Sequence, residues 1–127
     1  MAQLRRYQLS GDDYLYSHHI PKTAGQTFHT VLERFFKPEQ VCPARLWKQL
    51  IQIPQQELLQ YRLFSGHFYY YINQLLPREP IMVTMLRDPI KRTISHYQHT
   101  RRVDELYYHE QAVAGDLRSF VTSPVTR

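Results

Sequence analysis

The sequence predicts an α/β fold with a mainly parallel sheet. Short aromatic or apolar segments with strand character alternate with segments whose apolar residues recur at helical spacing. The 127 residues fit a single domain, 1–127, and no internal repeat, low-complexity tract or linker divides them. Ligands of such sheets bind at the carboxyl ends of the strands, so the loops that follow strands are the first candidates for a site.

Residues 14–20, YLYSHHI, predict the first strand, because they are short, rich in aromatic residues and followed by Pro21. A seven-residue loop, 21–27, separates this strand from a helix that Thr27 is expected to cap. Pro38 prevents this helix from continuing past Lys37. The apolar stripe of that helix, at i, i+3, i+4 and i+7, consists of Phe28, Val31, Leu32 and Phe35.

The middle of the chain predicts two short helices and two strands. Pro54 separates two helical pieces within residues 43–61, whose apolar face is formed by Leu46, Trp47, Leu50 and Ile51. Residues 62–72, RLFSGHFYYYI, have strand-like aromatic content that Gly66 interrupts. Residues 80–89, PIMVTMLRDP, contain a continuous apolar run, which predicts a strand buried on both faces.

Another helix is predicted after Pro89. Ile90, Ile94 and Tyr97 fall on one side of it, and Asp88 is expected to cap its first turn rather than to act as a base. The pattern is weaker in residues 104–127, where we expect one short helix around residues 116–121.

Composition favours anionic partners and is compatible with a reducing compartment. The formal net charge is +5 and most of the basic residues are arginine, which grips phosphate or sulfate with two parallel hydrogen bonds. Cys42 is the only cysteine, so neither an internal disulfide nor a cysteine-based zinc site is expected. We find no signal peptide and no apolar run of membrane-spanning length, which predicts a cytoplasmic protein, or a Golgi-luminal one if the chain is an excised domain.

The loop between the first strand and the first helix has the composition of a phosphate-binding turn. Helix N-termini attract anions, Gly25 allows close approach of the backbone, and Lys22 supplies a compact positive charge. Thr23 and Thr27 add hydroxyl donors. The lysine precedes the glycine and no earlier glycine is present, so the loop is not a Walker A nucleotide-binding loop.

A second group of polar residues follows the 80–89 strand. Arg87 ends that strand, and Ser95 follows eight positions later, off the apolar side of the next helix. An arginine and a serine so placed can hold a phosphate from two sides. Together with the first loop, this pair predicts a ligand that carries two separated phosphate-like groups.

The segments HIPKTAGQTF and MLRDPIKRTISHY resemble the 5′-phosphosulfate loop and the 3′-phosphate motif of sulfotransferases that use 3′-phosphoadenosine 5′-phosphosulfate (PAPS). The similarity covers about residues 14–100 and is greatest to the Golgi carbohydrate branch, with its heparan sulfate 2-O- and 6-O-sulfotransferases, and to bacterial relatives. The resemblance implies a P-loop-like three-layer α/β/α fold. The fold is expected to be incomplete at its C-terminus, because the family's later elements have no counterpart before Arg127.

The resemblance also implies the residues that bind the cofactor. Arg87 and Ser95 correspond to the family's ligands of the 3′-phosphate. Gln26 stands where the family usually has threonine or serine, so an amide replaces a hydroxyl near the sulfuryl end. The loop residues implied to wrap the 5′-phosphosulfate are Lys22, Thr23, Ala24, Gly25, Gln26 and Thr27, and no metal is expected.

Lys22 and His67 are the predicted catalytic residues. Lys22 is placed to stabilise the negative charge of the departing phosphate. A histidine suits the removal of a hydroxyl proton near neutral pH, and seven histidines are available. His67 follows Gly66 at a predicted strand end and resembles the family's base segment, although a purely structural role for it stays open. Tyr69, Tyr70 and Tyr71 are expected to alternate between core and surface, with stacking on sugar rings as the alternative.

The sequence therefore predicts sulfuryl transfer from PAPS to a hydroxyl acceptor, with a carbohydrate as the expected acceptor. The alternative is a truncated, inactive module that binds a nucleotide or another anion. Nucleic-acid binding has only the basic charge in its favour, and a nucleoside kinase is disfavoured by the absent Walker A spacing. The sequence assigns no oligomeric state.

Overall fold

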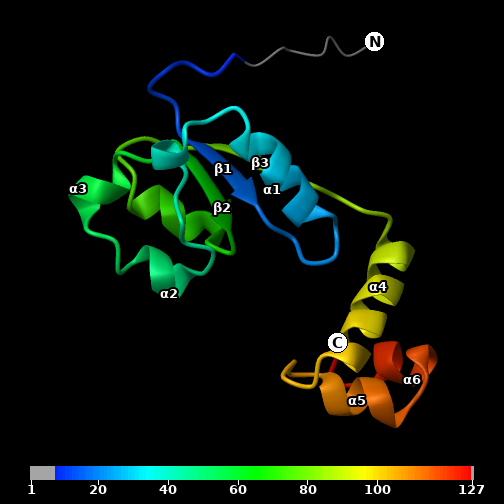
Figure 1. Ribbon diagram of the computed structural model, residues 1–127. Helices are drawn as coiled ribbons and strands as arrows, with labels where there is room; N and C mark the ends of the chain where they lie inside the picture. Colours follow the sequence, from blue (N-terminus) through cyan, green and yellow to red (C-terminus); the bar gives the residue numbers. More distant parts are fainter. Residues whose placement is uncertain (1–7, 127) are drawn as a thin grey trace. The chain divides into compact units, whose positions relative to one another are not determined.

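The computed structural model describes residues 8–126 (Figure 1). Contacts divide these residues into two compact units. The first unit comprises the described residues up to Ile20 together with Ala24–Met85, and the second comprises Pro21–Thr23 together with the described residues from Leu86 onward. The single domain expected from the sequence stays a prediction.

The first unit contains a parallel three-stranded sheet with the order β2-β1-β3. The strands are β1 (Leu15–His18), β2 (Leu63–Gly66) and β3 (Ile81–Thr84) (Figure 1). Leu15 lies opposite both Leu63 and Ile81, so the three strands end at the same edge of the sheet. The α/β class and the parallel sheet predicted from the sequence are confirmed.

Helical segments connect these strands. Between β1 and β2 the chain forms α1 (Gly25–Glu33), the 3-10 helix η1 (Pro38–Gln40) and the one-turn helices α2 (Trp47–Leu50) and α3 (Gln55–Leu58). The 3-10 helix η2 (Tyr69–Gln74) follows β2. The two helical pieces separated by Pro54 are thus confirmed, each as a single turn.

The core of the first unit lies on one face of β1 and β2. Tyr16 and Phe64 are fully buried there with Leu50 of α2, Leu58 of α3 and Ile72 of η2. The opposite faces of β1 and β2 are also buried, at Leu15, Ser17, Leu63 and Ser65. Both faces of these two strands are therefore covered, as in the central layer of an α/β fold.

The second unit is helical. It contains α4 (Pro89–Arg102), α5 (His109–Ala114) and α6 (Leu117–Thr122), which pack around Tyr97, Ala112 and Phe120. Asp88 caps α4, because its carboxylate accepts a hydrogen bond from the N–H of Lys91 at 2.9 Å. The cap at Asp88 and the helix around residues 116–121 are confirmed, whereas the sequence pattern did not reveal α5.

Several local predictions were wrong. Ala24 rather than Thr27 precedes α1, so the loop is shorter than expected. The predicted apolar stripe is not buried as a whole, since Val31 is 44% exposed and Phe35 lies beyond the end of α1. The strand within residues 62–72 ends at Gly66, and all three tyrosines Tyr69, Tyr70 and Tyr71 are exposed on or beside η2. An aromatic run suits a strand and an exposed turn alike, so its composition alone does not decide between them.

The β3 strand was also predicted wrongly. It pairs with β1 on one side only, and its residues alternate between partly buried and exposed, with Met82 38% exposed. On α4, Tyr97 is buried as expected, but Ile90 is 71% exposed. An apolar run therefore identified a strand without showing whether both of its faces are covered. Within the described part of the chain, no helix has the length and apolar character needed to cross a membrane.

Candidate functional site

The N-terminus of α1 follows a left-handed turn in the first unit. Ala24 has φ 64° and contributes no side-chain capping bond, and Gly25 begins the helix. The first helical hydrogen bond runs from the N–H of Phe28 to the carbonyl of Ala24 at 3.1 Å, so the N–H groups of residues 25–27 have no acceptor within the helix. The first turn contains no acidic residue. This end of α1 therefore suits an anion.

The main chain around His67 is held by two neighbouring segments. The N–H of His67 donates to the carbonyl of Arg45 at 2.9 Å. The hydroxyl of buried Tyr16 accepts from the N–H of Phe68 at 3.0 Å and donates to the carbonyl of Gly66 at 3.1 Å. The peptide units on both sides of His67 are thus fixed at the carboxyl end of β2.

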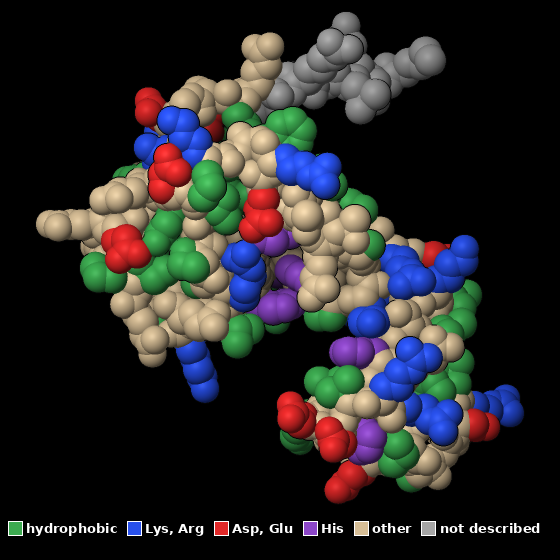
Figure 2. Space-filling model, in the orientation of Figure 1, with side chains coloured by type: hydrophobic (Ala, Val, Ile, Leu, Met, Phe, Trp, Pro, Cys, Tyr) green, Lys and Arg blue, Asp and Glu red, His purple; other side chains and the backbone are tan. Residues whose placement is uncertain are grey.

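Histidine side chains gather on one face of the first unit (Figure 2). The ring centroids of His19 and His67 are 5.0 Å apart, and His18 Nδ1 lies 2.9 Å from the hydroxyl of Tyr16. Burial, reinforced by the neighbouring His67, lowers the pKa of both His18 and His19. These two imidazoles therefore favour the neutral form at neutral pH.

A third histidine lies in an ionic cluster. His29 Nε2 is 2.8 Å from Glu33 Oε1 and 2.6 Å from Arg45 Nη2. Burial, with the charge of Arg45 as the second cause, lowers the pKa of His29. Because Arg45 also presents its carbonyl to His67, this cluster connects α1 to the segment that carries His67.

In the second unit, two arginines hold the loop that begins at Pro21. Arg87 Nη1 donates to the carbonyl of Lys22 at 3.2 Å, and Arg92 Nε donates to the carbonyl of Pro21 at 3.1 Å. Lys22 has φ 67°, a left-handed conformation that is unusual for a residue with a side chain. The hydrogen bonds to the carbonyls of Pro21 and Lys22 help to keep the loop in this conformation.

Two predicted ligands of the second unit have little exposed surface. Ser95 is half-buried in the second turn of α4, and Thr23 is buried.

The second unit also contains further basic groups near Lys22. Burial lowers the pKa of His96, and the nearby charges of Arg92, His99 and Lys22 act in the same direction. The potential around Lys22 is therefore positive, which favours an anionic ligand.

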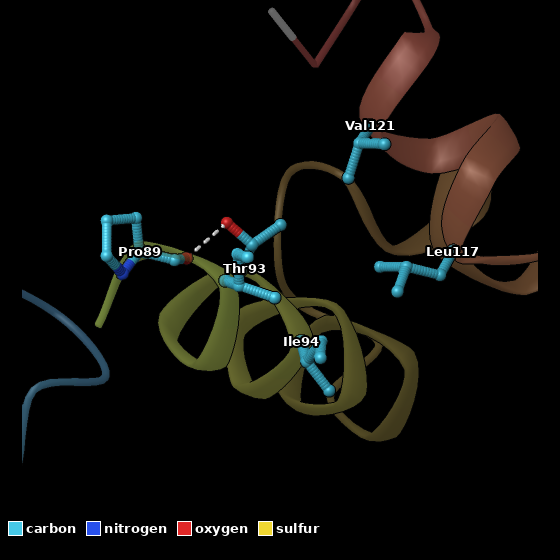
Figure 3. A pocket seen from close by; sticks show the side chains of 6 residues that line it. Pro89, Thr93, Ile94, Leu117 and Val121 are labelled. Carbon is cyan, nitrogen blue, oxygen red and sulfur yellow. Dashed lines mark hydrogen bonds between the residues drawn. The ribbon is translucent and has the colours of Figure 1, made fainter. Parts of the chain in front are cut away.

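An apolar depression of about 350 Å³ lies between α4 and α6 of the second unit (Figure 3). It is lined by Pro89, Ile90, Thr93, Ile94, Leu117 and Val121. The hydroxyl of Thr93 donates to the carbonyl of Pro89 at 2.8 Å, so the one polar side chain of the lining is already hydrogen-bonded. The depression lacks the cations and donors that a phosphate needs, and it contains none of the predicted site residues.

The structure thus groups the predicted site residues within each unit. Lys22 and Arg87 are joined by a hydrogen bond in the second unit, while Gly25 and His67 belong to the first. Sequence reasoning missed Arg92, although its place five residues after Arg87 was an available signal. Nothing in the sequence indicated Arg45, because its contact with His67 is through the main chain.

No group of three or more His, Cys, Asp or Glu side chains within residues 8–126 is arranged to hold a metal ion. The expectation that the site lacks a metal therefore stays a prediction from the resemblance.

Comparisons with known proteins define the class. The model of the sulfotransferase family matches residues 5–119, and the chain belongs to that family. A relative from Arabidopsis thaliana, named protein-tyrosine sulfotransferase, is 36% identical over 93 residues. The match covers 72% of this chain but 18% of the relative, so the chain spans less than a fifth of the relative's length. No solved structure gave a significant match.

Proposed function

We propose that the chain binds PAPS and transfers its sulfuryl group to a hydroxyl acceptor. The observation that carries this proposal is the hydrogen bond between Arg87 Nη1 and the carbonyl of Lys22, which joins two sequence motifs 65 residues apart. Membership of the sulfotransferase family supports the reaction class. The contact supports the view that the two motifs act on one ligand.

The residues present fit the cofactor in charge and in donor chemistry. The N-terminus of α1 has no side-chain cap, and its first turn contains no acidic residue. The main-chain donors of residues 25–27 and the hydroxyl of Thr27 would hold the 5′-phosphosulfate, with Lys22 and Thr23. Arg87 has guanidinium donors beyond the one that bonds to Lys22, and these would hold the 3′-phosphate with Ser95.

PAPS supplies an activated sulfuryl group, and its transfer leaves adenosine 3′,5′-bisphosphate. For this chemistry the chain must offset negative charge and accept one proton. The ammonium group of Lys22 would supply positive charge for the departing phosphate. His67 is proposed to take the proton of the acceptor hydroxyl at a ring nitrogen, and its fixed main chain restricts where that ring lies.

Two classes of hydroxyl acceptor have support. The resemblance of the two motifs to the carbohydrate branch supports a sugar hydroxyl. The name of the Arabidopsis relative supports the phenolic hydroxyl of a protein tyrosine. Both acceptors supply one hydroxyl proton, so the roles of Lys22 and His67 are the same in either case. An inactive nucleotide-binding module remains the competing function.

Two measurements test the proposal. Calorimetry with adenosine 3′,5′-bisphosphate should show binding that Lys22→Ala and Arg87→Ala each weaken at least tenfold, and unchanged binding by both variants would contradict the site. Mass-spectrometric detection of sulfate transfer to a glycan panel and to tyrosine-containing peptides identifies the acceptor. His67→Ala should abolish transfer and spare nucleotide binding. Nucleotide binding without transfer to either panel would favour the inactive module.

A further inference from the structure

In the first unit, His19 lies between the N-terminus of α1 and His67, the two parts of the candidate site in that unit. It follows β1 by one residue, and its main-chain N–H donates to the carbonyl of Gly66 at 3.1 Å. This bond fixes its backbone to the residue directly before His67. His19 is half-buried, so neighbouring atoms restrict the orientation of its ring.

The ring of His19 contacts both the start of α1 and the predicted base. Its centroid is 5.0 Å from that of His67, with the two rings tilted by 41°. A Cβ atom placed on Gly25 would lie 3.1 Å from Cδ2 of His19 and 3.2 Å from its Cγ and Nε2. These three distances are shorter than ordinary van der Waals contacts, so the ring leaves room for a glycine and for little more.

Gly25 is therefore explained by space rather than by backbone conformation. Among the described residues no glycine has a positive φ, so alanine could adopt the main-chain conformation of Gly25. The added methyl group would instead push the ring of His19, which lies against His67. A change of side chain at residue 25 would therefore move the ring of His19 and, through it, the imidazole of His67, the predicted base.

The charge state of His19 suits a packing role. Burial is the main cause that lowers its pKa, and His67, His29 and His18 act in the same direction. A neutral ring packs against His67 without the repulsion that a second positive charge would cause.

We propose that His19 is a positioning residue, whose ring sets the place of the His67 imidazole relative to the N-terminus of α1. This inference rests on the proposed function, since it takes His67 as the base and residues 25–27 as part of the cofactor site. His19 has no direct role in the chemistry. It keeps the proton acceptor in a fixed position with respect to the N-terminus of α1, which is proposed to hold the 5′-phosphosulfate.

A double-mutant cycle between Gly25 and His19 tests the contact without turnover. In NMR spectra of the unliganded protein, Gly25→Ala should shift the ring resonances of His67. In a His19→Ala background the same change should leave them in place, because the methyl group then has room. Gly11→Ala is the matched control, since a Cβ there meets nothing within 4 Å. Equal shifts in both backgrounds would overturn the contact.

Kinetics then test the consequence for catalysis. His19→Ala should lower kcat about tenfold while the dissociation constant for adenosine 3′,5′-bisphosphate changes less than twofold. His19→Phe restores a ring that cannot accept a proton, so it should recover at least a third of the rate and keep the acidic limb of the pH–rate profile. If His19→Phe were as inactive as His67→Ala, or lost that limb, His19 would be the base and the positioning role would be wrong.

The failure of this inference differs from that of the proposed function. A parent protein that neither binds the nucleotide nor transfers sulfate contradicts the proposed function, and the catalytic role of His19 falls with it. A parent protein that does both, but whose Gly25 and His19 substitutions act additively on kcat, contradicts the positioning role alone.

Discussion

The main chain of Gly66 lies directly against the carbonyl of Arg45. A Cβ atom on Gly66 would come within 2.2 Å of that oxygen, and the N–H of the next residue, His67, donates to it at 2.9 Å. The glycine thus allows the segment that precedes α2 to support the end of β2. Three structural features meet at this point: the strand end, the predicted base and the carbonyl that holds it.

Gly66→Ala should destabilise the first unit strongly, because the obstructing atom belongs to the main chain and cannot rotate away. We expect a loss of about 3 kcal/mol in the free energy of unfolding, as for a severely overpacked core. Urea denaturation followed by circular dichroism measures it. Gly11→Ala should change the midpoint little, and equal midpoints for the two variants would show that the contact is absent in solution.

Arg92→Ala should weaken cofactor binding without removing a predicted ligand of the cofactor. The substitution deletes the hydrogen bond to the carbonyl of Pro21, next to the strained residue Lys22. The loss of one such bond costs about 1 kcal/mol, or about a fivefold rise in the dissociation constant for adenosine 3′,5′-bisphosphate. Lys91→Ala removes the same charge from the neighbouring position. If calorimetry showed an equal effect for Lys91→Ala, general charge rather than the loop contact would be responsible.

Asp88→Ala should destabilise α4 by about 1 kcal/mol, the usual effect of losing an N-cap. The carboxylate of Asp88 accepts from the N–H of Lys91 at 2.9 Å, and an alanine leaves that donor without its partner. Thermal unfolding measures the change. Asp88→Asn should retain most of the stability, because asparagine caps equally well, and Asp104→Ala removes a similar charge from an exposed turn. A large loss for Asp104→Ala would indicate that charge, not capping, matters.

Stability should fall as the pH drops below about 6.5, the ordinary pKa of histidine. Burial lowers the pKa values of His18, His19 and His29 in the first unit and of His96 in the second. Between the lowered pKa and 6.5 the unfolded chain binds more protons than the folded one, so stability increases with pH across this window.

Thermal midpoints measured between pH 5 and 7.5 check this dependence. His19→Phe should reduce the slope, because it removes one group that must be neutral in the folded state. Gln98→Ala, a change at an exposed position that does not titrate, should preserve the slope. A midpoint that stays constant across the range would contradict the effect of the buried imidazoles.

Much of the fold could be predicted because its signals are local. Pro21 and Pro54 interrupt the pattern, helical spacing identifies the segment after Pro89, and Asp88 precedes a proline in a helix-starting position. The exposed face of β3 could not be predicted, since its exposure depends on what packs beside it. The start of α1 was placed three residues late, because Thr27 is a favourable cap and Ala24 is not, yet Ala24 adopts the left-handed turn.

The sequence by itself determined the class of the protein, since the two motifs around Lys22 and Arg87 carry the family resemblance and the local chemistry of an anion site. Only the tertiary structure decided how those residues are held. The hydrogen bonds from Arg87 and Arg92 to loop carbonyls, and the contact of His19 with His67, join residues far apart in the chain. Such contacts arise from strand register and packing, which leave no spacing in the sequence to identify them.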